Sequence, residues 1–267
     1  MALYRIVGGK MVENLIRFYK NIPRIYRHSI YRLKMHRKWT LLTFAIGILL
    51  TFIITMIFRR IGTVDVKLAT IDYRLTGLMT FAVIWIAIFI NYRFFPRDYY
   101  VTRHYNSTPF LHVLLSSALY SLVLLILTLV MAWLKPLNTD TTVIGVLFYI
   151  VMSLFFITVI SFLLGMIYIL YPKLDKVFYI VSLIVFCLSP ILYIPDGGWQ
   201  TRLLMLNPIF YLVNGMQQSV IIGKDAINNL GYHIYFFCFM GLMIVFSFAL
   251  KDYVTQLRPN EHQQLKS

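Results

Sequence analysis

Long apolar runs constrain this chain more than any other feature of its sequence. Six runs contain no Asp, Glu, Lys or Arg: Leu41 to Phe58, Leu75 to Ile90, Phe110 to Leu134, Val143 to Tyr171, Val177 to Ile194 and Tyr232 to Leu250. A helix of roughly 17–25 apolar residues crosses the hydrocarbon core of a bilayer, because it satisfies its backbone polar groups internally. The sequence therefore predicts an all-α polytopic membrane protein with six transmembrane helices.

Charge distribution predicts how these helices are oriented. If both termini are cytoplasmic, only seven of the 25 Lys and Arg residues lie outside: Arg59, Arg60, Lys67, Arg74, Lys135, Arg202 and Lys224. This bias follows the positive-inside rule and predicts both termini on the cytoplasmic side. A net charge of +15 would suggest a nucleic-acid partner for a soluble protein. Its placement beside apolar runs instead favours membrane lipids and argues against nucleic acid.

Residues 1–40 are predicted to form a cytoplasmic amphipathic interfacial segment, ahead of a transmembrane domain at 41–250 and a cytoplasmic tail at 251–267. Apolar residues recur at a spacing of three to four: Val12, Leu15, Ile16, Tyr19, Ile22, Tyr26, Ile30 and Leu33. Basic residues occupy the other positions around the helix, as in interfacial helices. We expect a break at Pro23 and a second helix after it. The segment is either a basic belt on anionic headgroups or a docking helix, and the two roles are compatible.

The longest cytoplasmic connection runs from Asn91 to Pro109. Pro96 suits the first turn of a short helix lying across the base of the membrane. That helix would carry mixed charged and aromatic residues: Arg97, Asp98, Tyr99, Tyr100 and Arg103. It is either a contact for another protein or an interfacial loop with tyrosines among the headgroups.

The stretch from Tyr171 to Asn214 predicts a broken element. It begins with a charged cytoplasmic corner containing Lys173 and Asp175, and Ser189-Pro190 falls near the far end of the following apolar run. Proline bends a helix and frees a carbonyl, which protein or water must then satisfy. Two further apolar pieces, each too short to span, are hinged at Asn207-Pro208. We expect a broken hairpin in the outer leaflet between the fifth and sixth spans.

Other features of the sequence predict helix packing, or argue against an ion-coupled site and a nucleotide-binding site. Ser161 and Gly165 form a pair of small residues that would allow close approach of a neighbouring helix. No acid or base lies near the middle of any run, which argues against a secondary transporter. The sequence Gly8-Gly9-Lys10-Met11 lacks the spacing and hydroxyl of a nucleotide-binding loop. We therefore expect no nucleotide site of its own.

The histidines and cysteines show no spacing typical of metal ligands, so no metal or other cofactor is expected. No catalytic residues are assigned, and the chain is not expected to be an enzyme. The nearest approach to a catalytic pair is His104 with Asp98.

Four short motifs carry a resemblance to a known family. They are Lys173-Leu174-Asp175, the run from Leu188 to Tyr193, Leu206-Asn207-Pro208, and Tyr211 to Asn214. In order and spacing they resemble the membrane subunit of ABC-2 type polysaccharide exporters, and most closely the teichoic acid translocation permeases. The chain departs from that family between Arg32 and Leu42. It departs again at Gly215-Met216-Gln217, where the family usually has an arginine.

The resemblance implies a homodimer in the bacterial plasma membrane, bound to two copies of a separate ABC ATPase and exporting a lipid-linked cell-envelope polymer. The interfacial segment and the helix from Arg97 to Arg103 would contact the ATPase. A gate would form around Ser189, Pro190, Asn207 and Pro208. Arg59, Arg60 and Arg202 would contact either substrate phosphate at the outer mouth or lipid headgroups.

Three alternatives remain open at this point. The first is an ABC-2 exporter of a drug, a lipid or a peptide, which would share this architecture. The second is a membrane-embedded envelope enzyme that acts on lipid-linked sugars. The third is a scaffold that transports nothing.

Overall fold

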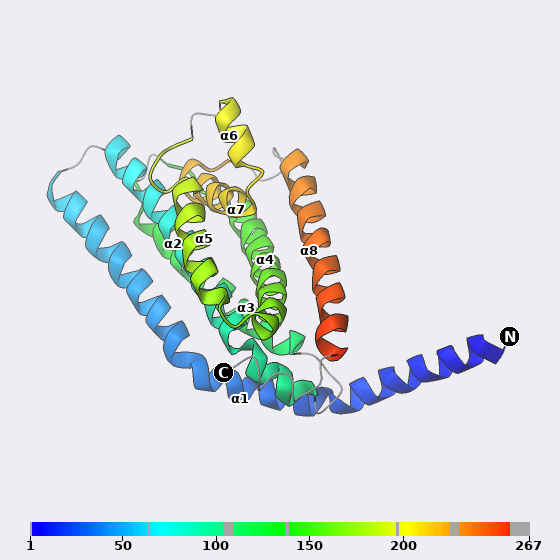
Figure 1. Ribbon diagram of the computed structural model, residues 1–267. Coiled ribbons are helices and arrows are strands. Elements are labelled where there is room, and N and C mark those ends of the chain that lie inside the picture. Colours follow the sequence, from blue (N-terminus) through cyan, green and yellow to red (C-terminus); the bar gives the residue numbers. More distant parts are fainter. Residues whose placement is uncertain are drawn as a thin grey trace.

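The computed structural model describes residues 2–62, 65–103, 109–136, 139–195, 198–224 and 230–256, and the side chains of 2–18, 25, 252, 255 and 256 lie outside that description. In these ranges the chain is helical and has no strand, so the all-α prediction is confirmed (Figure 1). The helices are α1 Ala2–Arg60, α2 Asp65–Arg103, α3 Phe110–Leu134, α4 Val143–Leu170, α5 Leu174–Leu188, α6 Trp199–Leu204, α7 Pro208–Gln217, the π-helical turn η1 Gln218–Ile222, and α8 Leu230–Gln256.

Five segments of the described chain are long and apolar enough to cross a membrane: Tyr19–Arg60, Asp65–Arg103, Phe110–Leu134, Val143–Leu170 and Leu230–Lys251. Helix α3 has the limits of the predicted third run, and α4 ends one residue before the predicted limit. Both runs end at polar or proline-containing loops that cannot continue an apolar helix. The sequence is therefore most informative where an apolar run has polar residues on both sides.

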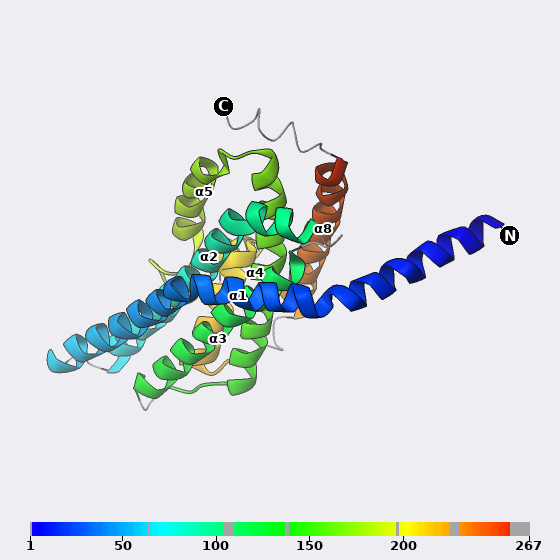
Figure 2. The same ribbon diagram turned by 90° about the horizontal axis from the view of Figure 1, so that it is seen from below.

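Helix α1 differs from the prediction because it is continuous from Ala2 to Arg60, with Pro23 inside it. The predicted break at Pro23 is wrong, while the division between an interfacial segment and the first span remains a prediction. Proline removes one helical hydrogen bond and bends a helix, but it does not oblige the helix to end. The N-terminal part of α1 projects beyond the helix bundle, its middle part lies across the lower end, and its last part rises to the upper end (Figures 1 and 2).

Helix α2 also continues through a predicted boundary. It runs from Asp65 to Arg103 without a break at Pro96, so the predicted separate helix is the last part of a long one. Asp98, Tyr99 and Thr102 are buried in this part. Their burial against neighbouring helices outweighs the cost of about 3 kcal/mol that a proline imposes within a helix.

Helix α5 is shorter than the predicted fifth span. It ends at Leu188, and Ser189 already has an extended backbone, so the helix stops before Pro190 instead of bending there. Its 15 residues extend for about 22 Å, less than the hydrocarbon core of about 30 Å. Trp85 of α2 stacks on Phe178 of α5 with ring centroids 5.1 Å apart, which fixes one face of α5 to the bundle.

Close approach of α2 and α4 depends on Gly165, as its pairing with Ser161 predicted. A Cβ atom at Gly165 would lie 2.3 Å from Cγ and 2.7 Å from Cβ of Phe95. Both small residues are buried, and Ser161 accepts a hydrogen bond from Asn91 of α2 at 3.5 Å. The prediction that this pair serves packing is confirmed.

Gly165→Ala is expected to lower the free energy of unfolding by about 1–3 kcal/mol, the usual cost of overpacking a core. The clash involves the first atoms of the Phe95 side chain, which cannot move without shifting α2. Gly241→Ala in α8 is the matched control, because nothing lies within 4 Å of its added methyl. Thermal unfolding in detergent micelles measures both variants. Equal stability of the two would contradict the close α2–α4 contact.

Candidate functional site

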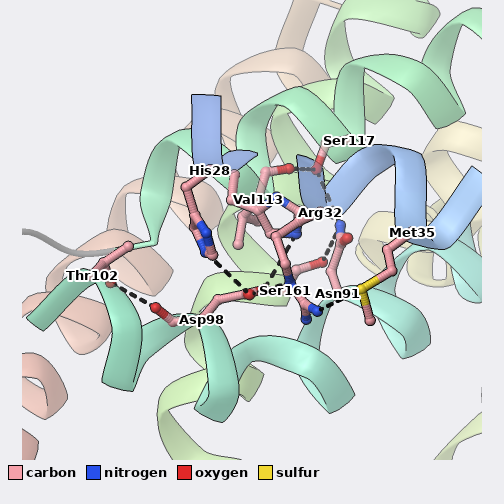
Figure 3. Close-up of polar contacts among 10 residues, drawn as sticks. His28, Arg32, Met35, Asn91, Asp98, Thr102, Val113, Ser117 and Ser161 are labelled. Atoms are coloured by element: carbon pink, nitrogen blue, oxygen red, sulfur yellow. Dashed lines mark hydrogen bonds and ion pairs between the residues drawn. The ribbon is translucent and has the colours of Figure 1, made fainter. Parts of the chain in front are cut away.

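A buried ion pair joins α1 to the lower end of the bundle. The Nε of Arg32 in α1 donates to Oδ1 of Asp98 in α2 at 2.6 Å, and each side chain is only 2% exposed. Nε2 of His112 in α3 lies 3.3 Å from Oδ2 of Asp98, and Nε2 of His28 lies 3.9 Å from Oδ1. Figure 3 shows His28 and Arg32 pointing from α1 toward Asp98. One carboxylate thus connects three helices, and we call these four residues the Asp98 cluster.

Aromatic and hydroxyl groups surround the Asp98 cluster. The guanidinium carbon of Arg32 lies 6.0 Å from the ring centroid of Phe94, and the ring of His36 lies 4.1 Å from the same ring. The hydroxyl of Thr102 donates to the backbone carbonyl of Asp98 at 2.8 Å. The charge of the Asp98 carboxylate is balanced by the guanidinium of Arg32, since an unpaired buried charge is strongly destabilising.

Polar contacts continue from this cluster into the bundle. The side-chain amide of Asn91 donates to the hydroxyls of Ser117 in α3 at 3.4 Å and Ser161 in α4 at 3.5 Å. Ser117 in turn donates to the carbonyl of Val113 at 2.8 Å. Figure 3 shows these residues beside the Asp98 cluster. The lower ends of α1, α2, α3 and α4 are therefore held together by hydrogen bonds as well as by apolar packing.

The residues predicted to contact a partner divide into two groups. Asp98 and Tyr99 are buried, whereas Arg97 and Tyr100 are exposed and Arg103 is half-buried. A coupling role for the five remains a prediction, and only the second group presents surface to another protein. His104, the proposed catalytic partner of Asp98, lies outside the described residues.

The charged corner before α5 lies at the same end. Asp175 is in the first turn of α5, where a carboxylate complements the helix dipole, and its Oδ1 accepts from the hydroxyl of Tyr92 at 2.9 Å. Lys173 is exposed beside it. The corner thus attaches the start of α5 to α2.

At the opposite end of the bundle, α7 is a short helix buried along its length from Ile209 to Gln217. Asn207 is its N-cap, and its side chain accepts from the backbone N–H of Ile209 at 3.1 Å. Pro208 occupies the first turn, where its missing N–H needs no partner. The predicted hinge at Asn207-Pro208 is therefore the capped start of a helix.

Gln217 of α7 forms hydrogen bonds to the segment that follows α5 and to α2. Its Nε2 donates to the carbonyl of Pro190 at 2.8 Å and to the carbonyl of Tyr73 in α2 at 3.0 Å. Ser189 and Pro190 are buried, and the Ser189 hydroxyl donates to the carbonyl of Val185 at 2.7 Å. The carbonyl that a proline frees lies four residues earlier, and here Phe186 accepts from the backbone N–H of Ser189 at 3.1 Å. The bond from Gln217 is an additional one, which the sequence did not reveal.

Further polar contacts fix α7 and η1 in place. The hydroxyl of Tyr73 donates to Oδ1 of Asn214 at 2.8 Å, and the hydroxyl of Tyr211 is hydrogen-bonded to Nδ1 of His233 in α8. The carbonyl of Val220 accepts from the hydroxyl of Thr141 at 2.8 Å. These contacts tie the short buried segment to α2, α8 and the connection between α3 and α4.

The three arginines predicted to contact phosphate do not form one site. The guanidinium of Arg59 donates to the carbonyl of Leu134 at the end of α3. Arg60 is exposed at the end of α1, and Arg202 is exposed on α6. The end of α1 and α6 lie apart (Figure 1).

A scan against models of known protein families and a search of curated proteins both find no match to this chain.

Proposed function

We propose that this chain is the membrane subunit of an ABC exporter that moves a lipid-linked cell-envelope polymer, such as a teichoic acid, powered by a separate ATPase subunit. The observation that supports the proposal most is the Asp98 cluster. It locks a helix lying across one end of the bundle to α2 and α3 through the buried Arg32–Asp98 pair. A partner that pushes on this helix would therefore move the bundle.

Helix α2 provides a direct mechanical connection between the two ends. Asp98 near one end binds α1, and Tyr73 near the other end binds Asn214 and Gln217 of α7. The 25 residues between Asp98 and Tyr73 correspond to about 38 Å of helix. A shift of α2 at the cluster would reach α7, which suits a gate that has two discrete arrangements.

Charge supports a cytoplasmic position for the Asp98 cluster, with α6 and α7 in the outer leaflet and both termini inside. Basic residues of α1 near the cluster, such as Arg24 and Arg27, are exposed and suited to anionic headgroups or to a partner. The apolar outer face of α5, including Ile180, Leu183 and Ile184, is exposed. It could form a homodimer contact.

The proposal is tested by reconstituting the chain with the ATPase that copurifies with it and measuring ATP hydrolysis. We expect the chain to stimulate the ATPase and Arg97→Glu with Tyr100→Ala to reduce that stimulation several-fold, because both side chains are exposed at the proposed contact. Gln200→Glu, exposed on α6 at the opposite end, is the control and should leave stimulation unchanged. If no ATPase binds or responds, the exporter proposal is wrong.

The cargo is tested separately by depleting the chain from cells. Blocked export should make lipid-linked polymer accumulate on the cytoplasmic side. An unaltered envelope in depleted cells, combined with normal ATPase stimulation, would refute the polymer as cargo and leave an exporter of another substrate.

A further inference from the structure

A groove of about 670 Å³ runs between α1 and α2, separate from the Asp98 cluster and from α7. Gly47 lets α1 approach Leu127 of α3, since a Cβ there would lie 2.8 Å from that side chain, and Leu127 forms part of the groove. The remaining lining is mostly apolar and includes Leu42, Ile46, Leu50, Ala82, Val83 and Ile86.

One end of the groove is cationic. Among the described lining residues Arg93 is the only charged one, and it lies with Trp39 and Phe94 at the end nearer the Asp98 cluster. Its guanidinium carbon is 5.4 Å from the ring centroid of Phe89, which holds the charge at the mouth of the groove. No ion pair within the described chain involves Arg93. The side chain is exposed and can accept an anionic partner.

The length of the groove matches one leaflet of a membrane. Its lining on α1 extends from Trp39 to Leu50, which is about 17 Å of helix. Half of a hydrocarbon core of about 30 Å is about 15 Å. An indole and a guanidinium at one end and aliphatic side chains along the rest match the change from headgroups to acyl chains.

The chemistry of the groove indicates its occupant. An apolar lining with a single exposed guanidinium at one end matches a molecule with hydrocarbon chains and an anionic headgroup.

We propose that this groove is a binding site for one anionic phospholipid, whose acyl chains lie between α1 and α2 and whose phosphate pairs with Arg93. The guanidinium fork suits phosphate because it can donate two parallel hydrogen bonds. The site does not depend on the exporter proposal, since it needs neither an ATPase nor a polymer.

The test is to purify the full chain in detergent with equal amounts of phosphatidylglycerol and phosphatidylcholine and to measure the retained lipid by mass spectrometry. We expect about fivefold preference for phosphatidylglycerol, the effect of one favourable basic contact. Arg93→Gln should abolish this preference. Arg97→Gln, one turn further along α2 and outside the groove, should preserve it.

A second pair of variants tests the groove itself. Ala82→Phe fills it and should reduce retention of both lipids, whereas Ala45→Phe, exposed on α1 outside the groove, should not. Arg93→Gln keeps the test valid if Ala82→Phe fails to fold.

Three outcomes would overturn the lipid site. One is equal retention of the two lipids by the unaltered chain, and another is equal loss of preference in Arg93→Gln and Arg97→Gln, which would indicate a diffuse basic belt. The third is a change in oligomeric mass of Ala82→Phe with unchanged lipid, which would show that protein covers the groove.

Discussion

Arg32→Ala is expected to lower the free energy of unfolding by about 3–5 kcal/mol, because it leaves the carboxylate of Asp98 buried without its closest partner. For a chain of this size the loss corresponds to a fall in Tm on the order of 10 °C. The two histidines beside Asp98 cannot replace the permanent charge of a guanidinium. Thermal unfolding in detergent micelles measures the effect.

Two further variants show whether the pairing of charges matters or only the bulk of the Arg32 side chain. Arg37→Ala removes an exposed arginine of the same helix and should change stability by less than about 0.5 kcal/mol. The double variant Arg32→Met with Asp98→Leu removes both charges and should recover much of the loss, since apolar replacement of a buried pair is often neutral. If Arg32→Ala is as mild as Arg37→Ala, Asp98 is not buried against α1.

The sequence predicted the elements whose ends are marked by a change in polarity. Phe110 to Leu134 and Val143 to Tyr171 are apolar runs between polar segments, and α3 and α4 follow them closely. The ends of α1 and α2 were less predictable, because each helix continues past its apolar run into amphipathic sequence. Pro23 and Pro96 each predict a helix boundary, but α1 and α2 continue through them, and contacts around Asp98 stabilise α2 beyond Pro96.

The Asp98 cluster illustrates what pattern reasoning misses. Asp98 is the one acid between Asn91 and Pro109, a segment with several arginines, and this isolation was a signal that it has a specific partner. Nothing in the sequence distinguished Arg32 from the other basic residues of α1 as that partner. The pairing depends on how α1 crosses the bundle, which is a property of the three-dimensional arrangement.

The break at Ser189-Pro190 after α5 was predictable from the sequence, but the hydrogen bond that stabilises the segment after it was not. Ser189-Pro190 predicts a freed carbonyl, which for Pro190 is that of Phe186, and this carbonyl accepts from the backbone N–H of Ser189. Gln217, 27 residues after Pro190, donates instead to the carbonyl of Pro190 itself. Gln217 lies in the stretch Gly215-Met216-Gln217. Gly215 allows this placement, because a Cβ there would lie 2.1 Å from the ring of Tyr149.

Gln217→Glu is expected to lower the free energy of unfolding by about 3–5 kcal/mol. The substitution keeps the shape of the side chain but replaces a donor with a charged acceptor facing the carbonyls of Pro190 and Tyr73. Gln217→Leu also removes the donor without adding charge, so its cost should be smaller, about 1–3 kcal/mol for the buried carbonyl left unpaired. Which variant loses more stability is as informative as the size of each loss. If Gln217 contributed only by packing, the two variants would have similar free energies of unfolding.

Acidic pH provides an independent measurement for the same site. A protonated carboxyl at position 217 has one O–H that can donate to a carbonyl, so lowering the pH should restore part of the stability of Gln217→Glu and none of that of Gln217→Leu. Gln200→Glu, exposed on α6, is the matched control for added charge and should respond little. If Gln217→Glu is as stable as Gln200→Glu at neutral pH, Gln217 does not bridge α5 and α2. The proposed mechanical connection from α2 to α7 would then lose the bond between Gln217 and Tyr73 and keep only the one between Tyr73 and Asn214.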